Sequence, residues 1–357
     1  MKINKLELGN ALAQVRCAVN PKHSYYSHVL IEADEEIRLT ATNGSMFVRS
    51  NVDAGVIVEP GAVLIDAAKL SQLHSLGKPF DIEQDDKIAH IKCGRSKLKF
   101  PLIDAIAFPR IDPPLGEPWF EMDFEIPVMQ VLFAAAELNF GRPEFESVCM
   151  QYVKDGFILV STNGYRIAET FCASDISEFK SVLLSSECLK ACKGVLGDSD
   201  KHKVWIESNQ CKVEFDKTLI TMRLVDGTFP DYTAIIPKNP PSVFTVNVAE
   251  LQEALRITTI AEGDKHCIGL NAEPDKLTLW TFSGTYQASE YVSVNGTIKP
   301  FKTGINSKFL NEALKHVKSA EVEIHFPESA TSCLIVDTDN RRHRQVIACM
   351  TPPPDLP

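Results

Sequence analysis

Several features that mark membrane, secreted or low-complexity proteins are missing from this sequence of 357 residues. No apolar run approaches the roughly 18 residues that a membrane-spanning helix needs. The opening stretch, MKINKLELGNAL, interrupts every apolar segment with polar residues, so we expect no signal peptide and a cytoplasmic location. Hydrophobic residues make up 44% of the chain and charged residues 24%, which is typical of globular proteins rather than disordered ones.

The ten cysteines lack the arrangement of a disulfide framework or a metal site. They are scattered along a long chain without a secretory signal, which favours reduced and mostly buried thiols. Cys188 and Cys192 are four residues apart in a helix-like stretch and could place two ligands on one face. No other His or Cys pair has the spacing of a zinc site, so core packing is the favoured interpretation. We therefore expect no metal and no other cofactor.

Catalytic motifs are also missing. The sequence contains no GxxxxGK[ST], GxGxxG, GxSxG or HExxH pattern. Two acidic pairs, Asp85-Asp86 and Glu35-Glu36, lie in expected turns, where carboxylates are solvated. Four histidines in polar contexts are interpreted as surface side chains, with phosphate contacts as the alternative: His23, His28, His202 and His343. We expect a protein without catalytic activity of its own.

Positive charge is scarce, since the net charge is −10. Phosphate neutralisation requires Lys and Arg, so the overall charge taken alone argues against nucleic-acid binding. A protein can nevertheless gather its basic residues on one surface and cover the rest with acids. The distribution of the Lys and Arg residues along the chain therefore decides whether nucleic-acid binding is expected.

Proline clusters are present at two places and divide the chain into thirds. Residues 111–118 read IDPPLGEP and residues 237–241 read PKNPP. Proline breaks helices and central strands, so both segments are expected to be linkers. We predict three modules, with boundaries at residues 1–116, 117–241 and 242–357.

The thirds share one sequence pattern. Residues 37–48 read IRLTATNGSMFV, residues 157–168 read FILVSTNGYRIA, and residues 277–288 read LTLWTFSGTYQA. Each segment is an alternating strand, a turn at a glycine and a second alternating strand. Gly44 and Gly164 are as far apart as Gly164 and Gly284. Three hairpins in the same phase indicate an internal triplication.

Helices are expected to repeat in the same way, two in each third. Amphipathic patterns predict helices within residues 9–19, 62–76, 127–138, 181–196, 247–260 and 302–317. The segments at 62–76, 181–196 and 302–317 each begin with a short apolar strand. Helices on one face of antiparallel sheets make an α+β module, and three in tandem predict a curved array.

Basic side chains recur on these helices and next to them. A single charged position on a helix is ordinarily just solvated, but equivalent helices biased to cations in an acidic protein favour a basic track for phosphates. The candidate DNA-facing residues are Arg16, Lys22, Lys69, Arg142, Lys190, Lys193, Arg256, Lys308 and Lys315.

A resemblance to one family rests on several motifs. Residues 223–232 read RLVDGTFPDY and residues 235–240 read IIPKNP, a run that resembles the signature of bacterial DNA polymerase III beta subunits. The TNGYRIA stretch at 162–168 is similar to that family's TDGHRLA. The GRS stretch at 94–96, Phe108-Pro109 and the helix start at 304–314 also match, so the resemblance spans the whole chain.

The resemblance implies a DNA sliding clamp, a non-catalytic processivity factor. Two chains would join head to tail into a ring of six modules, with helices facing double-stranded DNA and sheets outside. DNA polymerase and the clamp loader would attach through short hydrophobic peptides. The family's peptide pocket maps onto Thr162, Gly164, Tyr165, Arg166, Ile167, Pro230, Ala234, Ile235, Asn306, Phe309, Val346, Ile347, Ala348 and Met350.

Several points of the resemblance leave alternatives open. Any of Ile167, Ile235 and Val346 could instead be a core residue. The family's dimer contacts map onto Leu98, Phe100 and Ile260, which could also be internal. Many relatives carry Arg in place of Ala234 and often Tyr in place of Phe309, and the ending TPPPDLP differs from the family's short tail. The alternative function is a clamp-fold scaffold that binds peptides without encircling DNA.

Overall fold

The computed structural model describes residues 1–52, 54–197 and 199–354. The helices are α1 (Gly9–Val15), α2 (Ala67–Ser75), α3 (Glu125–Leu132), α4 (Ser186–Leu196), α5 (Val248–Thr258) and α6 (Ser307–Lys315). Two short 3₁₀ helices follow α1 and α5, η1 (Arg16–Ala18) and η2 (Thr259–Ala261). All six predicted helical segments therefore contain a helix. None of the helices that the structure describes is long and apolar enough to cross a membrane.

The chain forms two compact units, which are described separately. The first contains residues Met1–Glu125 and Glu187–Val225, and the second contains Ile126–Ser186 and Asp226–Pro357. Both units take segments from the middle third of the chain. The module boundaries expected from the sequence stay a prediction.

The first unit contains two antiparallel sheets. One has the order β5-β1-β7-β8-β9, and the pairings of the other run β10-β15-β16-β17-β4-β3-β2-β6. The strands of the first sheet are β1 (Lys2–Glu7), β5 (Ala54–Glu59), β7 (Phe80–Gln84), β8 (Ile88–Cys93) and β9 (Ser96–Pro101). Those of the second are β2 (His28–Ala33), β3 (Ile37–Thr42), β4 (Met46–Asn51), β6 (Gly61–Asp66), β10 (Phe120–Met122), β15 (His202–Ile206), β16 (Gln210–Phe215) and β17 (Thr218–Val225).

The second unit also has two antiparallel sheets. In the first, the pairings run β14-β11-β12-β13-β25-β24-β23-β18-β21. In the other, called sheet D below, they run β22-β19-β20-β21, so the long strand β21 belongs to both. The strands are β11 (Ser147–Val153), β12 (Gly156–Thr162), β13 (Arg166–Ala173), β14 (Val182–Ser185), β18 (Ser242–Asn247), β19 (Cys267–Glu273), β20 (Lys276–Phe282), β21 (Gln287–Thr297), β22 (Phe301–Asn306), β23 (Glu321–Phe326), β24 (Ser332–Asp337) and β25 (His343–Ala348).

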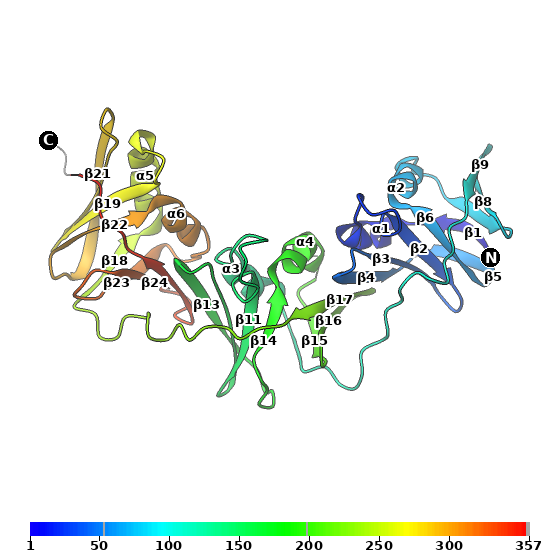
Figure 1. Cartoon of the computed structure of the whole chain (residues 1–357), viewed down its shortest axis with the longest axis horizontal. Helices are drawn as coiled ribbons and strands as arrows, with labels where there is room; N and C mark the ends of the chain where they lie inside the picture. The colour runs from blue at the N-terminus through cyan, green and yellow to red at the C-terminus, as the bar shows by residue number, and fades with distance from the viewer. Residues whose placement is uncertain (53, 198, 355–357) are drawn as a thin grey trace. The chain divides into compact units, whose positions relative to one another are not determined.

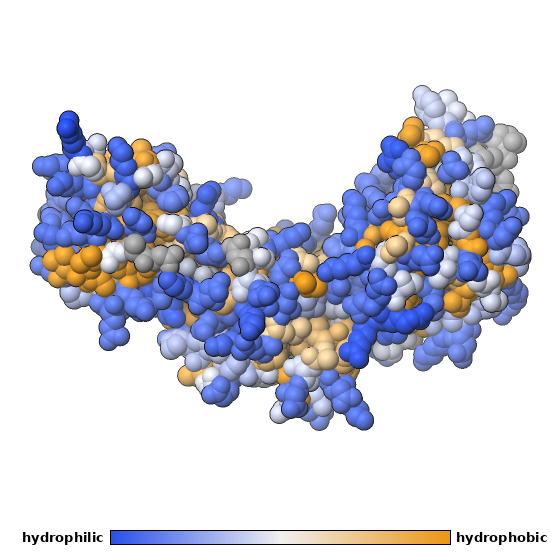
Figure 2. Space-filling model, turned by 180° about the vertical axis from the view of Figure 1, so that it is seen from behind, coloured by the Kyte–Doolittle hydropathy of each residue, from blue (hydrophilic) through white to orange (hydrophobic). Residues whose placement is uncertain are grey.

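The core of the last third packs α5 and α6 against these sheets. Leu251, Leu255, Leu310 and Leu314 contribute from the two helices, and alternate residues of each strand complete the cluster. Asn247 and Asn306 accept a hydrogen bond from a backbone N–H in the first turn of α5 and α6 respectively, which satisfies one of the free donors there. Figure 1 shows both helices on the same side of the strands that they cover. Over the visible face of the molecule hydrophilic side chains predominate, with separate apolar patches between them (Figure 2).

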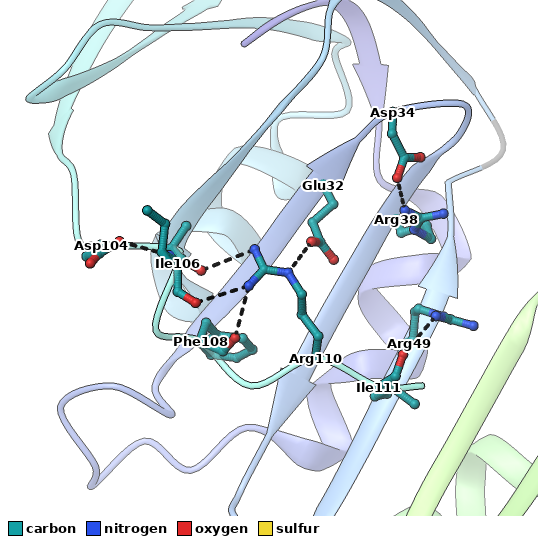
Figure 3. A network of polar contacts seen from close by, with 10 residues as sticks. Glu32, Asp34, Arg38, Arg49, Asp104, Ile106, Phe108, Arg110 and Ile111 are labelled. Carbon is teal, nitrogen blue, oxygen red and sulfur yellow. Dashed lines mark hydrogen bonds and ion pairs between the residues drawn. The ribbon is translucent and has the colours of Figure 1, made fainter. Parts of the chain in front are cut away.

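The loop that leads into the first proline-rich linker, residues 105–110, is fastened to its own unit. Phe108 is buried against Leu30 and Leu64. In Figure 3 the Arg110 side chain points toward Glu32 and toward the backbone of Ile106 and Phe108. It donates to Glu32 at 2.8 Å and to the backbone oxygens of Ile106 and Phe108 at 3.2 and 3.4 Å. The side chain of Arg110 thus closes the loop that precedes it and attaches the loop to β2.

Candidate functional site

A pocket of about 230 Å³ opens within the second unit. Its walls come from the turn between β12 and β13, from the segment after β17 and from β25. The residues that line it are Phe145, Thr162, Gly164, Tyr165, Arg166, Ile167, Pro230, Asp231, Tyr232, Ile235, Val346 and Ala348. The walls are mainly apolar, with a small number of polar groups, as is usual for sites that bind a ligand in one orientation.

The turn between β12 and β13 is held by its own side chains. The Asn163 Oδ1 accepts hydrogen bonds from the backbone N–H groups of Tyr165 and Arg166 at 3.0 and 3.1 Å. The Thr162 hydroxyl accepts from the Gly164 N–H at 3.0 Å and donates to the Arg166 carbonyl at 2.7 Å. Gly164 has a φ of +88°, which a side chain would strain. This rigid turn leaves the Tyr165 ring exposed at the rim.

The opposite wall is the Phe-Pro-Asp-Tyr segment. Tyr232 is buried, and Asp231 accepts hydrogen bonds from the N–H and hydroxyl of Thr233 at 3.0 and 2.7 Å. Burial raises the pKa of the Tyr232 hydroxyl well above its usual range, and the nearby Glu169 carboxylate raises that pKa further. Tyr232 therefore stays neutral. Ile235, farther along the same segment, is half-exposed at the pocket mouth.

The floor of the pocket is the pairing of β13 with β25. Ile167 lies opposite Val346, and both side chains are almost completely buried. The Ala348 N–H donates to the Tyr165 carbonyl at 2.8 Å, which extends the ladder to the rim. Because β13 belongs to the middle third and β25 to the last, this seam brings together pocket residues that are far apart in the sequence.

Arg166 is packed rather than solvated at the pocket wall. Its guanidinium lies 4.5 Å from the centre of the Phe309 ring and 5.2 Å from that of Phe133. Nη1 pairs with Glu312, and Nη2 donates to the Phe133 carbonyl at 2.5 Å. The buried Nε has no hydrogen-bond partner among the residues that the structure describes. Arg166 therefore braces the pocket wall through Phe309, Phe133 and Glu312, and its one unsatisfied donor is buried.

Five residues that the resemblance assigned to the pocket do not line it. Ala234 lines a neighbouring hollow of about 630 Å³, which shares Ile235 and Ala348 with the pocket. The Asn306 side chain caps α6, and Phe309 packs on the core and on Arg166. Ile347 is directed into the core and Met350 pairs with Gly304.

Strand alternation explains why Ile347 does not line the pocket. Neighbouring side chains on β25 point to opposite faces, so Val346 and Ala348 can line the pocket only if Ile347 points away. Conversely, Phe145, Asp231 and Tyr232 line the pocket and were missed. Asp231 and Tyr232 belong to the motif that carried the resemblance, whereas Phe145 is brought in by tertiary packing alone.

The nine candidate DNA-facing residues are all exposed. Two of them pair with carboxylates, Arg142 with Glu144 at 3.0 Å and Arg256 with Glu253 at 2.6 Å. Lys308 and Lys315 line a hollow of about 750 Å³ between α5 and α6. The exposed positions can reach an anion, since they are not part of the buried core.

The candidate dimer contacts lie at surface positions. Leu98 and Phe100 are half-buried on β9, the edge strand of its sheet, so they are not core residues. Ile260 is 81% exposed in η2. An exposed edge strand with apolar side chains is a template for pairing with another chain.

Two of the histidines interpreted as surface residues are buried. The His202 Nδ1 accepts from the Phe124 N–H at 3.2 Å, and its Nε2 lies 3.0 Å from the Leu196 carbonyl. The His343 Nδ1 lies 3.2 Å from the Glu169 carbonyl, and burial lowers its pKa to about 4. Polar neighbours in the sequence misled the interpretation, because hydrogen bonds from distant segments satisfy both rings.

The ten cysteines all lie in the described part of the chain and form no disulfide, and most of them are buried. Burial raises the pKa of Cys149 and of Cys172 to about 12. Cys188 and Cys192 are in the core, as the spacing argument favoured. Within the described part of the chain, no group of His, Cys, Asp and Glu residues is placed to hold a metal ion.

Comparisons with known proteins give one result along the whole chain. Models of the DNA polymerase III beta subunit match the N-terminal domain at residues 1–112, the central domain at 122–231 and the C-terminal domain at 233–351. The beta sliding clamp of Haemophilus influenzae is 26% identical, with 98% of each chain covered. The beta sliding clamp of Escherichia coli strain K12 is 24% identical over 89% of each.

Solved structures agree in fold. The DNA polymerase III subunit beta of Pseudomonas aeruginosa superposes with a TM-score of 0.91 at 21% identity, covering 98% of this chain and 99% of the other. The beta subunit of Thermotoga maritima gives a TM-score of 0.87 at 23% identity, with 98% of both chains covered. The expectation of three tandem α+β clamp modules is thereby confirmed.

Proposed function

Because the chain belongs to the DNA polymerase III beta subunit family, we propose that it encircles duplex DNA as a head-to-tail dimer and tethers a DNA polymerase to its template. Its function is that of a DNA sliding clamp, a processivity factor. In this role the chain would carry out no catalytic step, bind no cofactor and act in the cytoplasm. Its three modules would be residues 1–116, 117–241 and 242–357.

The pairing between repeats is the observation that supports the ring. The strand after the Gly44 hairpin, β4, pairs with β17, the last strand of the second repeat. The strand after the Gly164 hairpin, β13, pairs with β25, the last strand of the third repeat. Following the same rule, the strand after the Gly284 hairpin, the first half of β21, should pair with β9, the last strand of the first repeat.

These two edges have no such partner within one chain. Among the described residues, β9 pairs only with β8, and residues 287–293 of β21 pair only with β20. Pairing β9 of one copy with β21 of a second completes the cyclic pattern, and the reciprocal contact closes a ring. Ile260 fits this arrangement because η2 packs against β21.

The register of the proposed β9–β21 pairing follows from the registers of two pairings within the chain, β4 with β17 and β13 with β25. Met46 lies opposite Met222, and Arg166 lies opposite Ile347, each two residues after its turn glycine. By equivalence, Tyr286 of one copy should oppose Phe100 of the other. Leu98 would then oppose Ala288, which places the half-buried side chains of β9 on the same face as an exposed tyrosine.

On DNA, the nine exposed cations would contact backbone phosphates. Such contacts depend on charge and not on sequence, so they hold a duplex without fixing the position of the ring. Topology rather than affinity then keeps the ring on DNA. Attached partners are kept at a high local concentration near the template.

For partners, we assign the pocket between the β12–β13 turn, the Phe-Pro-Asp-Tyr segment and β25 to short hydrophobic peptides of DNA polymerase and the clamp loader. Apolar walls supply burial for such a peptide, and the few polar groups of the lining can fix its orientation. Although Asn306, Phe309, Ile347 and Met350 do not line this pocket, Phe309 supports it through Arg166.

Retention on DNA tests the proposal. After loading, the protein should leave circular DNA slowly and linear DNA quickly, and it should sediment as a dimer at micromolar concentration. A stable monomer, or equal loss from both DNA forms, would count against the ring. Reversing the charges of Lys69, Lys190 and Lys315 together should reduce loading onto DNA and leave peptide binding unchanged.

The same charge reversal distinguishes the ring-shaped clamp from the alternative, a clamp-fold scaffold that binds peptides without encircling DNA. For a scaffold, retention on DNA would be absent in the unmodified protein and the three reversals would change nothing. The unpaired edges of β9 and β21 favour the ring, because a scaffold has no need of two complementary edges.

A further inference from the structure

The outer face of sheet D carries two glycines, Gly269 and Gly304, beside a tryptophan, Trp280. Gly269 lies opposite Gly304 on one side and opposite Trp280 on the other, so the three form a line across β22, β19 and β20. Their neighbours Ile268, Leu279 and Ile305 point into the core. Because side chains alternate along strands, the glycines and Trp280 face away from the core.

Trp280 is nevertheless only 4% exposed. Its ring lies across Gly269, where a Cβ would come within 2.2 Å of the indole. The Lys302 Nζ lies 5.0 Å from the ring centroid, so a cation is positioned over the aromatic face. The remaining cover is supplied by the segment that follows β25.

This segment, residues 350–354, passes over Gly304 and reaches the Trp280 indole. Met350 exchanges backbone hydrogen bonds with Gly304, both at 2.9 Å. The Thr351 carbonyl accepts from the Cys267 Sγ at 3.5 Å, and the Pro354 carbonyl accepts from the Trp280 Nε1 at 3.1 Å. A Cβ on Gly304 would lie 2.8 Å from the Met350 oxygen and 2.9 Å from the Pro352 Cα, so only glycine admits the segment.

The chemistry of these contacts is that of proline-rich recognition. Three consecutive prolines, Pro352 to Pro354, favour the extended polyproline II conformation and lose little entropy when bound. Domains that read such segments use aromatic grooves together with donors to backbone carbonyls. Trp280 supplies both the aromatic wall and the indole donor. Gly304 admits the backbone of the segment, and Gly269 lets the indole lie flat on the sheet.

We propose that this face of sheet D is a binding site for a proline-rich segment, and that residues 351–354 occupy it as a built-in ligand which a proline-rich peptide can replace in trans. The site is distinct from the pocket assigned to hydrophobic partner peptides, and it does not depend on the ring. The bridge between Met350 and Gly304 directs the segment that follows Ala348 over sheet D.

The test is fluorine NMR of 5-fluorotryptophan incorporated into the full chain and into a chain that lacks residues 351–357. The three tryptophan resonances are assigned by Trp280→Phe and Trp119→Phe. Deletion should move the Trp280 resonance and leave the other two in place. A peptide with the sequence of residues 350–357 should then return it toward its original position.

Competition supplies the quantitative readout. If the built-in segment is docked most of the time, the peptide should bind the shortened chain at least about tenfold more tightly than the full chain. A peptide with alanine in place of Pro352, Pro353 and Pro354 is the control and should bind more weakly. An unmoved Trp280 resonance after deletion, or no peptide binding at millimolar concentration, would each overturn the proposal.

A glycine variant keeps the test decisive if the deletion unfolds the chain. Gly304→Ala in the full chain should displace the segment, because the added Cβ meets backbone atoms, and should move the Trp280 resonance as the deletion does. Gly194→Ala on α4 is the matched control, since a Cβ there meets nothing within 4 Å. Equal spectra for the two variants would contradict the proposal.

Discussion

Glu169 and Arg344 lie opposite each other in the β13–β25 pairing, and their side chains form an ion pair in which the carboxylate is almost completely buried. The pair lies on the seam that also carries Ile167 and Val346, the floor of the pocket. The Tyr232 hydroxyl lies against the same carboxylate, which connects the Phe-Pro-Asp-Tyr segment to the seam.

Removing the cation of this pair should destabilise the second unit. Arg344→Met leaves the Glu169 carboxylate buried without its partner, and we expect the free energy of unfolding to fall by about 2–3 kcal/mol in urea titrations. Lys299→Met, which breaks an exposed pair with Glu328, is the control and should cost less than about 0.5 kcal/mol. Similar losses for the two variants would show that the seam does not depend on the ion pair.

Acid should weaken the fold through His343. Its folded-state pKa is about 4, because burial disfavours the charged ring, although nearby Asp337 and the Glu169 carbonyl partly oppose this and His316 adds to it. An unfolded histidine titrates near 6.5. The unfolded chain therefore binds the extra proton first, and stability present above about pH 6.5 is lost as the pH falls toward 4.

The measurement is the free energy of unfolding across this pH range, compared between the parent chain and His343→Asn. We expect the parent to lose up to about 3 kcal/mol more than the variant. His28→Asn, at a half-buried position, is the control. Parallel pH profiles for parent and His343→Asn would contradict the assignment.

Peptide affinity should depend on the mouth of the pocket. Ile235→Ala removes apolar surface that is half-exposed in the free protein, so binding of a labelled short hydrophobic peptide should weaken by about 1–2 kcal/mol while stability changes little. Phe309→Ala should weaken it by about 1–3 kcal/mol by releasing Arg166. Ile106→Ala, at an exposed position elsewhere, should leave the affinity unchanged, and an equal loss there would undo the assignment.

The register between copies can be tested by cross-linking. Leu98→Cys combined with Ala288→Cys should form a disulfide between two chains under mild oxidation, because directly opposed residues have Cβ atoms about 4.5–5.5 Å apart. Leu98→Cys combined with Ser289→Cys is shifted by one position, which turns the thiol to the other face, and should react far less. Efficient cross-linking in the shifted pair would disprove the register.

Much of the fold was predictable because its signals are local. The Asn-Gly turns at Gly44 and Gly164 and the alternating strands beside them are dictated by neighbouring residues, and the hairpins form where the sequence places them. The helices begin at caps such as Asp66 and Asn306 for the same reason. The family motifs also led to nine of the residues that line the pocket.

What the sequence by itself determined was thus the triplication, the α+β modules and the family, because each is read from patterns of neighbouring residues that recur along the chain. Only the tertiary structure decided that β13 pairs with β25, that His202 and His343 are buried, and that Ile347 faces the core while Phe145 reaches the pocket. It also placed residues 351–354 over Trp280. Burial and pairing at such distances depend on which segments meet, and neither periodicity nor turn chemistry encodes that choice.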